Sequence, residues 1–360
     1  MIKYLFVITS LGFLLEPRFA VSAEYSAKPD YFLKGGDISM LPKFEELGAV
    51  YEENEEPNDA LVIMMRNGCN CFRLRLFVNP IGKNAVVQDL DYVVKLAKRV
   101  KRAGASIILD IHYSDTWADP GQQCKPNAWK DLSFSELESI VERYSANVIS
   151  RMRDAGSLPE YVQVGNEINR GFLWPDGKWS KSENGWQDFT TLLKAGIRGV
   201  KQPLQATEAV QIMIHIATGG SAEKTAFFFS NIQKHQVEYD MIALSYYPWH
   251  HGTIEDLKAN LQTTAKTFEK EIVVVETAYP WHSGEPLANL EFPESPQGQK
   301  EYLETLLETV KTTPNSLGKG VLWWYPESIL TKGLYVWKGG RLALFNDEDQ
   351  RLPALDAFRK

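Results

Sequence analysis

Residues 161–167 read YVQVGNE, a short apolar run that ends in an amide and a carboxylate. Runs of this length, rich in Val, Ile, Leu and aromatic residues, are typical of strands that are buried on both faces of a parallel sheet. Seven further runs of the same kind follow one another along the chain. Together they predict eight strands, over 32–37, 72–77, 106–112, 161–167, 210–216, 241–247, 272–276 and 320–324.

The stretches between these runs have the spacing of amphipathic helices. Leu90, Val93, Leu96 and Val100 fall on one face, with Lys and Arg on the other, and Gly104 stands where this helix should end. Eight strands alternating with helices predict an α/β fold, a single (β/α)8 TIM barrel with its active site at the C-terminal ends of the strands. An open doubly wound sheet is the alternative. It would gather ligand groups near one switch point, whereas here polar or aromatic residues end nearly every run.

The first 23 residues have the pattern of a secretory signal peptide. They contain an early Lys, an apolar run of about 12 residues and small residues before a predicted cut after Ala23. A membrane anchor is the alternative, but spanning a bilayer takes roughly 20 apolar residues. We therefore expect a catalytic domain over 24–360 in a protein that is secreted, periplasmic or held at the cell surface, with no transmembrane segment after cleavage. The sequence has no heptads, so we expect a monomer.

The net charge is −7, from 39 Lys and Arg against 46 Asp and Glu, and this argues against nucleic acid or an anionic membrane as partner. Three cysteines allow at most one disulfide, and the pairing of Cys69, Cys71 and Cys124 stays open. The sequence shows no cluster with metal-ligand spacing, so no cofactor is predicted. The unusual feature is an aromatic content of 12%, with 10 Trp.

Two glutamates follow strands directly, Glu167 on the fourth and Glu276 on the seventh. A carboxylate at the rim of an apolar barrel loses hydration energy that an acid on a helix surface would keep, so two of them indicate a functional pair. Paired carboxylates in a groove lined with aromatic rings are typical of glycoside hydrolysis. A gap of about 5 to 5.5 Å gives retention of configuration and one of roughly 6.5 to 9.5 Å gives inversion. The sequence alone leaves this choice open.

Other polar and aromatic residues at the strand ends have roles under this hypothesis. Arg73 would hold a neighbouring carboxylate ionised, with Arg75 on the same strand face as a second candidate, and Asn166 could donate to a sugar hydroxyl. Flat rings can stack on the apolar face of a pyranose. Seven tryptophans follow strand ends: Trp117, Trp129, Trp174, Trp249, Trp281, Trp323 and Trp324.

Five segments resemble the endo-β-1,4-galactanases of glycoside hydrolase family 53. They are FRLRLFVNP at 72–80, DIHYSDTWADPGQQ at 110–123, VQVGNEINRGFLWP at 162–175, LSYYPWHHGT at 244–253 and VVVETAYPW at 273–281. The resemblance implies a retaining endo-hydrolase that cuts β-1,4-galactan of pectic type I arabinogalactan. It also implies that Glu167 is the general acid/base and Glu276 the nucleophile.

The same resemblance implies residues that bind substrate. Arg73, Asn166 and Trp324 correspond to residues near the bond that is cut, and Tyr247 to one that orients the nucleophile. The further expected groove residues are Asp37, His112, Asp115, Trp117 and Trp249. The chain departs from the family where many members read Trp-Glu-Pro, because it has Trp324-Tyr325-Pro326. Some bacterial relatives hold calcium near the last strands, but we interpret the acidic residues 346–349 as a solvated turn and expect no metal.

Two other functions stay open. The first is an endo-glycanase of the same clan that cuts mannan, xylan or glucan, and the loop 112–120 is the feature that should separate the two. The second is a protein that captures glycans without cutting them, against which the presence of both glutamates argues.

Overall fold

The computed structural model describes residues 32–82, 85–182 and 185–360. The predicted signal peptide, 1–23, and the first residues of the predicted domain, 24–31, lie outside the described residues. Residues 32–360 form one compact unit.

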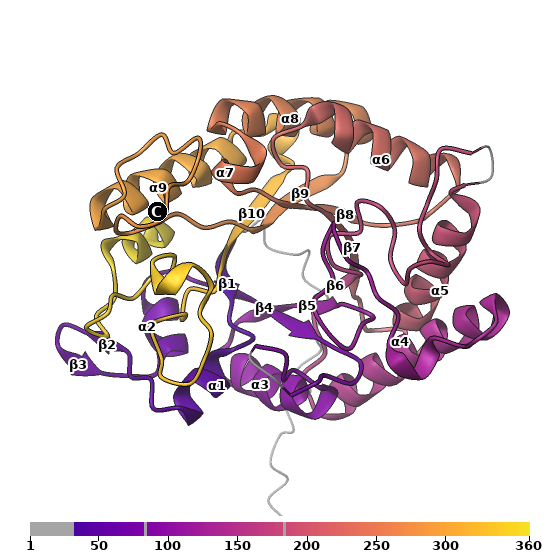
Figure 1. Ribbon diagram of the computed structural model, residues 1–360, viewed down its shortest axis with the longest axis horizontal. Coiled ribbons are helices and arrows are strands. Elements are labelled where there is room, and N and C mark those ends of the chain that lie inside the picture. Colours follow the sequence, from indigo (N-terminus) through magenta and orange to yellow (C-terminus); the bar gives the residue numbers. More distant parts are fainter. Residues whose placement is uncertain (1–31, 83–84, 183–184) are drawn as a thin grey trace, which may run out of the picture. The chain divides into compact units, whose positions relative to one another are not determined.

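Eight parallel strands close into a barrel in this unit (Figure 1). Around the barrel β1 pairs with β4, the strands follow in chain order to β10, and β10 closes onto β1. The strands are β1 Leu33–Asp37, β4 Cys71–Leu76, β5 Ser106–Ile111, β6 Tyr161–Val164, β7 Gln211–Ile216, β8 Met241–Ser245, β9 Glu271–Glu276 and β10 Gly318–Trp324. The predicted fold and all eight predicted strands are confirmed. The predicted fourth and sixth strands are too long, because β6 stops at Val164 and β8 at Ser245.

Helices follow the strands and surround the barrel (Figure 1). They are α2 Ala60–Arg66, α3 Leu90–Ala103, α4 Phe134–Asp154, α5 Gln187–Lys201, α6 Ala222–Lys234, α8 Ile254–Phe268 and α9 Pro296–Lys311. Shorter helices are α1 Leu41–Glu46, α7 Pro248–His251 and the 3-10 turns η1 Asn127–Trp129, η2 Pro314–Ser316, η3 Trp337–Gly340 and η4 Pro353–Arg359. A small hairpin, β2 Glu52–Glu53 with β3 Glu56–Pro57, lies in the connection after β1 and was not predicted.

Helix α3 shows why the predicted pattern holds. Asp89 caps its first turn by accepting a hydrogen bond from the Tyr92 amide, and Gly104 ends it with a left-handed φ of 87°. The apolar stripe of the sequence, including Val93 and Leu96, is buried against the barrel. Local propensity and tertiary packing therefore agree for this element.

The strands separate two apolar cores. On β5, Ile107, Leu109 and Ile111 pack in the large core that also contains the buried faces of the helices, whereas Ile108 belongs to a second, smaller core. Since side chains alternate along a strand, the second core is the barrel interior. Asp110 shares the face of Ile108 and therefore points inward above it. This alternation fixes which strand-end side chains can meet at the C-terminal mouth.

No helix within the described ranges is long and apolar enough to cross a membrane. Cys69, Cys71 and Cys124 are free thiols; the first two are buried and the third is exposed.

Candidate active site

Glu276 is turned into the barrel by an extra residue in its strand. In the pairing of β8 with β9, Leu244 lies opposite Val274 and Ser245 lies opposite Glu276, so Val275 has no counterpart. Such a β-bulge changes the alternation of side chains beyond it. Strict alternation would give Glu276 the outward face of Val274. The bulge instead places it beside Ser245, facing the interior.

Glu167 follows β6 on a tight turn. Gly165, with φ 91°, and Glu167, with φ 47°, both have left-handed backbone. Glycine adopts this conformation freely, but it strains a glutamate by about 1–3 kcal/mol. The Asn169 side chain holds the turn by exchanging hydrogen bonds of 2.7 and 3.0 Å with the backbone of Ala217 after β7. The surrounding loops therefore fix a strained backbone at this glutamate.

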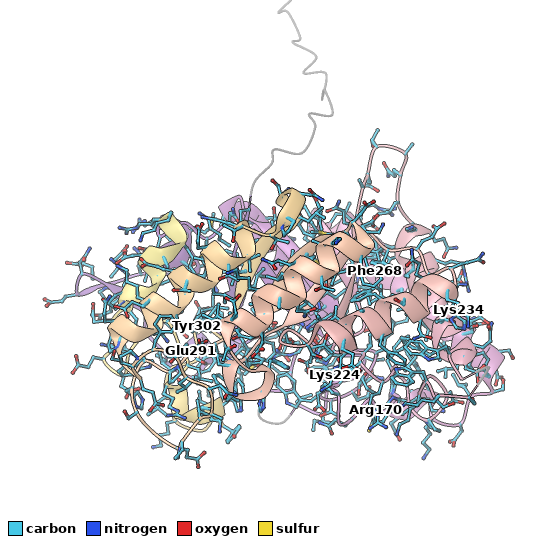
Figure 2. All side chains as sticks on the ribbon, turned by 90° about the horizontal axis from the view of Figure 1, so that it is seen from above. Arg170, Lys224, Lys234, Phe268, Glu291 and Tyr302 are labelled. Carbon is cyan, nitrogen blue, oxygen red and sulfur yellow. The ribbon has the colours of Figure 1, made fainter. Side chains whose placement is uncertain are left out.

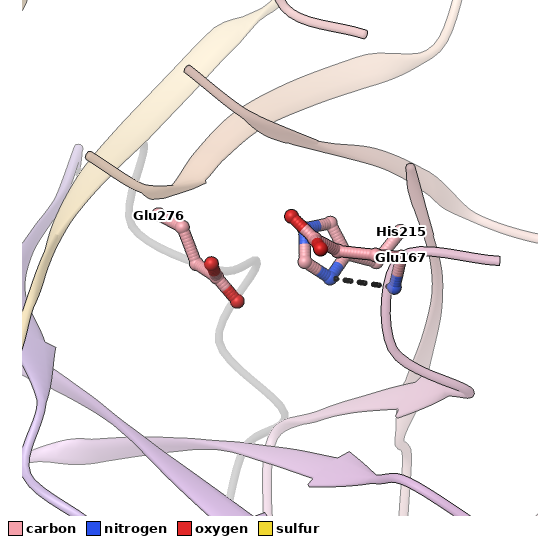
Figure 3. A group of neighbouring side chains, drawn as sticks. All are labelled: Glu167, His215 and Glu276. Atoms are coloured by element: carbon pink, nitrogen blue, oxygen red, sulfur yellow. Dashed lines mark hydrogen bonds between the residues drawn. The ribbon is translucent and has the colours of Figure 1, made fainter. Parts of the chain in front are cut away.

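The two carboxylates face each other across the barrel mouth (Figure 3). One oxygen of Glu167, one oxygen of Glu276 and a ring nitrogen of His215 all lie within 4.8 Å of one another. At this separation the charge on one carboxylate opposes ionisation of the other. The structure thus brings together the two residues that the sequence singled out as a pair.

Arg73 lies beneath this pair with all its nitrogens engaged. Nε donates to Gln163 Oε1 at 2.6 Å and Nη1 to Asp37 Oδ2 at 2.8 Å. Nη2 donates to Asp110 Oδ2 at 2.9 Å and lies 3.0 Å from Glu276 Oε1. Strand register places Asp37 directly beside Arg73. The predicted contact between Arg73 and a strand-end carboxylate is therefore present.

The environment of Glu276 favours its ionised form more than burial alone would allow. Its Oε2 accepts a 3.0 Å hydrogen bond from the Tyr247 hydroxyl, and Oε1 pairs with Arg73. Burial raises the pKa of Glu276 to about 7, against the opposing effects of Arg73 and of the Tyr247 hydrogen bond. The contacts with Arg73 and Tyr247 therefore favour the ionised form of Glu276.

Glu167 holds its proton more strongly. Burial, and then the charge of Glu276, raise its pKa to about 8, while a hydrogen bond from Ser245 works in the opposite direction. Ser245 Oγ donates to Glu167 Oε1 at 2.6 Å and lies 2.8 Å from His215 Nε2. The two glutamates titrate as a coupled pair, and the contacts of Glu276 with Arg73 and Tyr247 favour the arrangement in which the shared proton lies on Glu167.

His215 supports Glu167 as a neutral ring. Burial, and then the nearby charge of Arg73, hold its pKa well below the ordinary value. Its Nδ1 accepts a 3.4 Å hydrogen bond from the Glu167 amide and lies 3.0 Å from Asn166 Oδ1. Because the ring stays uncharged, it orients Ser245 and the backbone of Glu167 without competing as a proton donor.

Three predicted site residues are occupied by protein contacts. Asn166 Oδ1 accepts from Arg73 Nη2 at 2.7 Å, and one of its amide hydrogens goes to the Ala118 carbonyl at 2.7 Å. Asp37 is fully buried against Arg73. His112 is also buried, with Nε2 2.9 Å from Asp110 Oδ2. Direct contact of these residues with a ligand stays a prediction.

Asp115 lies in the loop after β5 and ties neighbouring segments together. Its carboxylate oxygens accept from the amides of Asn79 at 2.9 Å and Asn127 at 2.8 Å. The structure therefore gives it a role in loop packing, and its predicted contact with substrate stays a prediction.

Two groups of rings lie at the barrel mouth. Trp117 covers the Arg75 guanidinium at 4.3 Å, and Trp324 stacks on Tyr325 with centroids 4.6 Å apart. In the second group, Trp249 lies 5.4 Å from Tyr247 and 6.1 Å from Trp337. Tyr325, at the departure from the family pattern, accepts a 2.6 Å hydrogen bond from Arg75.

Not all of the seven tryptophans belong to this mouth. Trp323 points outward, is fully buried, and donates to the Leu342 carbonyl at 2.7 Å, because it alternates with Trp324 along β10. Trp129 is 5% exposed and packs on Tyr144 of α4. These two therefore belong to the packing around the barrel and do not line the mouth.

Several residues of the site were not predicted from the sequence. Ser245, Asp110, Gln163 and Trp337 contact the predicted residues directly. Inward alternation on β5 and β6 could have indicated Asp110 and Gln163, since each lies on the face that points into the barrel. Ser245 gave no such indication, because a serine within an apolar strand is compatible with plain packing.

Among the described residues, one group of three possible metal ligands converges, and it is Glu167, His215 and Glu276 themselves. In the acidic turn near the C-terminus, Asn346 Oδ1 accepts hydrogen bonds from the amides of Glu348 and Gln350. The side chain of Asn346 thus stabilises the turn through hydrogen bonds within it. The expectation that no calcium binds here stays a prediction.

A family model with the description Glycosyl hydrolase family 53 matches residues 33–358. The chain belongs to this family. The glycoside hydrolase is 33% identical, over 91% of its length and 89% of the relative's, to an arabinogalactan endo-β-1,4-galactanase of Cellvibrio japonicus. The family 53 catalytic domain of Ignisphaera aggregans matches it with a TM-score of 0.85 at 34% identity, covering 92% of this chain and 96% of that one. A fungal β-1,4-galactanase matches with a TM-score of 0.81 at 31% identity, covering 91% and 99%.

Proposed function

We propose that this family 53 hydrolase cuts internal β-1,4-galactosidic bonds of galactan and type I arabinogalactan with retention of configuration. The observation that carries the chemistry is the approach of the Glu167 and Glu276 oxygens to within 4.8 Å. Two carboxyl groups at about 5 to 5.5 Å suit a double displacement, and a water molecule that attacks between them needs roughly 6.5 Å or more. The substrate class comes from the similar galactanases.

In this proposal Glu276 is the nucleophile. Its pairing with Arg73 and Tyr247 favours the ionised form, and Oε1 accepts no hydrogen bond from the described residues. That oxygen attacks the anomeric carbon and forms a galactosyl ester as the bond to the leaving oxygen breaks. Water then attacks the ester and regenerates the carboxylate.

Glu167 is the general acid/base. With its pKa raised to about 8, it still holds a proton at neutral pH and passes it to the leaving oxygen. As a carboxylate it then removes a proton from the incoming water. Beneath the site, three carboxylates face two guanidinium groups, which leaves one net negative charge; the residues are Asp37, Asp110 and Glu276 against Arg73 and Arg75. A net negative charge here stabilises the positive charge of an oxocarbenium-like transition state.

The discriminating experiment is a product profile on four polysaccharides. Potato β-1,4-galactan, mannan, xylan and glucan are incubated with the protein, and new reducing ends and oligosaccharide lengths are measured. We expect short galacto-oligosaccharides from galactan and none from the others. Release from mannan, xylan or glucan without release from galactan would replace the proposed substrate, and binding of galactan without any release would indicate a capture protein.

A second experiment separates the two glutamates. Glu276→Gln should lower kcat on every galactoside by roughly 10⁴-fold or more. Glu167→Ala should lose activity on galactan but keep much of it on an aryl galactoside with an activated leaving group, which needs no proton. Equal loss of both substrate types in Glu167→Ala would contradict its assignment as the acid.

We also propose that the protein is exported as a monomer. The sequence pattern over 1–23 supports export. Export also fits the proposed substrate, because a polysaccharide cannot enter a cell and must be cut outside it. N-terminal sequencing of protein from the medium or periplasm should start at Glu24. Retention of residues 1–23 in the mature protein would contradict cleavage of a signal peptide. The mass of a dimer in solution would contradict the monomer.

A further inference from the structure

A third group of rings lies beside the turn that carries Glu167, on the loop after β6 and on α6. Trp179 stacks on Trp186 with centroids 4.6 Å apart and an angle of 14°, and Phe227 packs on both at 5.6 and 5.9 Å. Phe227, on α6, is 44% exposed. The Trp179 indole donates a 2.8 Å hydrogen bond to the Asn169 carbonyl. The exposed Phe227 and the partly exposed Trp179, backed by the buried Trp186, therefore form an aromatic platform that is fixed to the turn that carries Glu167.

This platform borders a pocket of about 520 Å³ that also touches residues at the ends of β6 and β7. The pocket is rich in positive charge. Its charged lining consists of Arg170, Lys181 and Lys224 against one acid, Glu223. Arg170 and Lys224 are both exposed, and neither forms an ion pair with any residue that the structure describes. Figure 2 shows both at the same edge of the molecule, with Lys234 at the far end of α6.

The position of the pocket identifies what it would bind. A general acid must lie on the leaving-group side of the bond, because it protonates the leaving oxygen. Asn169 and Arg170 come two and three residues after Glu167, whereas the rings around Tyr247, Trp249 and Trp324 lie on the Glu276 side. The pocket therefore takes the part of the chain that departs with the leaving oxygen.

Charge identifies the kind of sugar. A neutral galactose needs only a ring to stack on and partners for its hydroxyls. The pocket lining has an excess of two positive charges, although the whole chain has a net charge of −7. This local charge matches a sugar that carries a carboxylate better than it matches a neutral sugar. Arg170 and Lys224 lose their mutual repulsion when an anion lies between them, and the flat platform remains available for the sugar ring.

Building on the proposed function, we propose that this pocket is a leaving-group subsite for an acidic sugar, a uronic acid. The enzyme would then prefer galactan bonds that are followed, towards the reducing end, by a carboxylate-bearing unit. Trp179 supplies the stacking surface, and Arg170 and Lys224 bind the carboxylate.

The test compares two tetrasaccharides. One is β-1,4-linked galactotriose attached to galacturonic acid at the reducing end, and the other is β-1,4-galactotetraose, which is its carboxyl-reduced counterpart. At low ionic strength we expect kcat/KM to be about 5-fold higher for the acidic substrate. In 0.5 M NaCl this ratio should fall towards one, since exposed charges are screened.

Matched variants connect the preference to the pocket. The double variant Arg170→Gln/Lys224→Gln should bring the ratio to one. Lys234→Gln, which removes an exposed charge from the other end of the same helix, should leave the ratio unchanged. A wild-type ratio of one or less, or an unchanged ratio in the double variant, would overturn the proposal.

Failure of this proposal can be distinguished from failure of the proposed function. If neither tetrasaccharide is cut, the galactanase assignment fails. The acidic-sugar subsite is then tested by measuring the binding of the two tetrasaccharides. Calorimetry on Glu276→Gln should then show that the acidic tetrasaccharide binds more tightly than galactotetraose. This difference in affinity should disappear when Arg170→Gln and Lys224→Gln are added to Glu276→Gln. Equal binding of the two sugars would overturn the subsite.

Discussion

The Ser245 hydroxyl, at the end of β8, donates a 2.6 Å hydrogen bond to Glu167 Oε1, although β7 separates β8 from the strand that Glu167 follows. This bond lowers the pKa of Glu167, against the larger effects of burial and of Glu276 that raise it to about 8. Ser245→Ala should therefore raise this pKa further and move the alkaline limb of kcat/KM to higher pH. The pH dependence of galactan hydrolysis measures the shift. A limb that stays in place or moves to lower pH would contradict the contact.

Tyr247→Phe should act on the opposite limb. The Tyr247 hydroxyl donates to Glu276 Oε2 at 3.0 Å and lowers the pKa of that group. Without it, Glu276 holds its proton to higher pH, and the acid limb of kcat/KM should move up while the alkaline limb moves less. Because the two glutamates titrate as a pair, both profiles are fitted with two apparent pKa values. Equal movement of both limbs in both variants would show that neither contact acts on its own carboxylate.

Arg73→Met should destabilise the fold as well as inactivate the enzyme. Arg73 pairs with Asp37 and Asp110, and all three side chains are fully buried. Removing one partner of such a network leaves buried charges uncompensated and costs about 3–5 kcal/mol. Denaturant unfolding measures the loss. The control is Arg198→Met, whose guanidinium is 49% exposed beside Glu138 and Glu142 and whose removal should cost about 1 kcal/mol or less. Similar losses in both variants would contradict the buried network.

Glu167→Gln should stabilise the protein, and more so at higher pH. In the native state Glu167 keeps its proton up to about pH 8, whereas the ordinary value is 4.5. The folded protein thus binds more protons than the unfolded one between these values, and stability falls as pH rises through them. Glutamine removes this loss, so the gain should be near zero at pH 4.5 and about 4 kcal/mol at pH 8, which corresponds to the shift of the pKa from 4.5 to about 8. Thermal unfolding at the two pH values measures the gain in stability. A gain that appears only at pH 4.5 would contradict a raised pKa of Glu167.

The fold was predictable because each element carries its own pattern. Apolar runs such as 106–112 are typical of strands buried on both sides, and the stripe from Leu90 to Val100 is typical of a helix that covers them. Alternation along a strand also separates Trp324, which faces the mouth, from Trp323, which faces the helices. These features depend on local periodicity, which the sequence shows directly.

The contacts of the site depend on register, which the sequence does not show. The bulge at Val275 leaves no mark in the run IVVVE, yet it decides that Glu276 faces inward. Ser245 meets Glu167 only because loops and strands from distant parts of the chain converge. Arg73 could be predicted to pair with a carboxylate, but its choice of Asp37, Asp110 and Glu276 together follows from three-dimensional packing.

The most direct test of the central claim is the anomeric form of the first product. Real-time proton NMR during hydrolysis of β-1,4-galactan records the new reducing end before mutarotation. Double displacement through Glu276, with Glu167 as acid and base, predicts that the β-anomer forms first and the α-anomer grows in afterwards. Initial appearance of the α-anomer would show inversion and would contradict the assignment of Glu276 as the nucleophile.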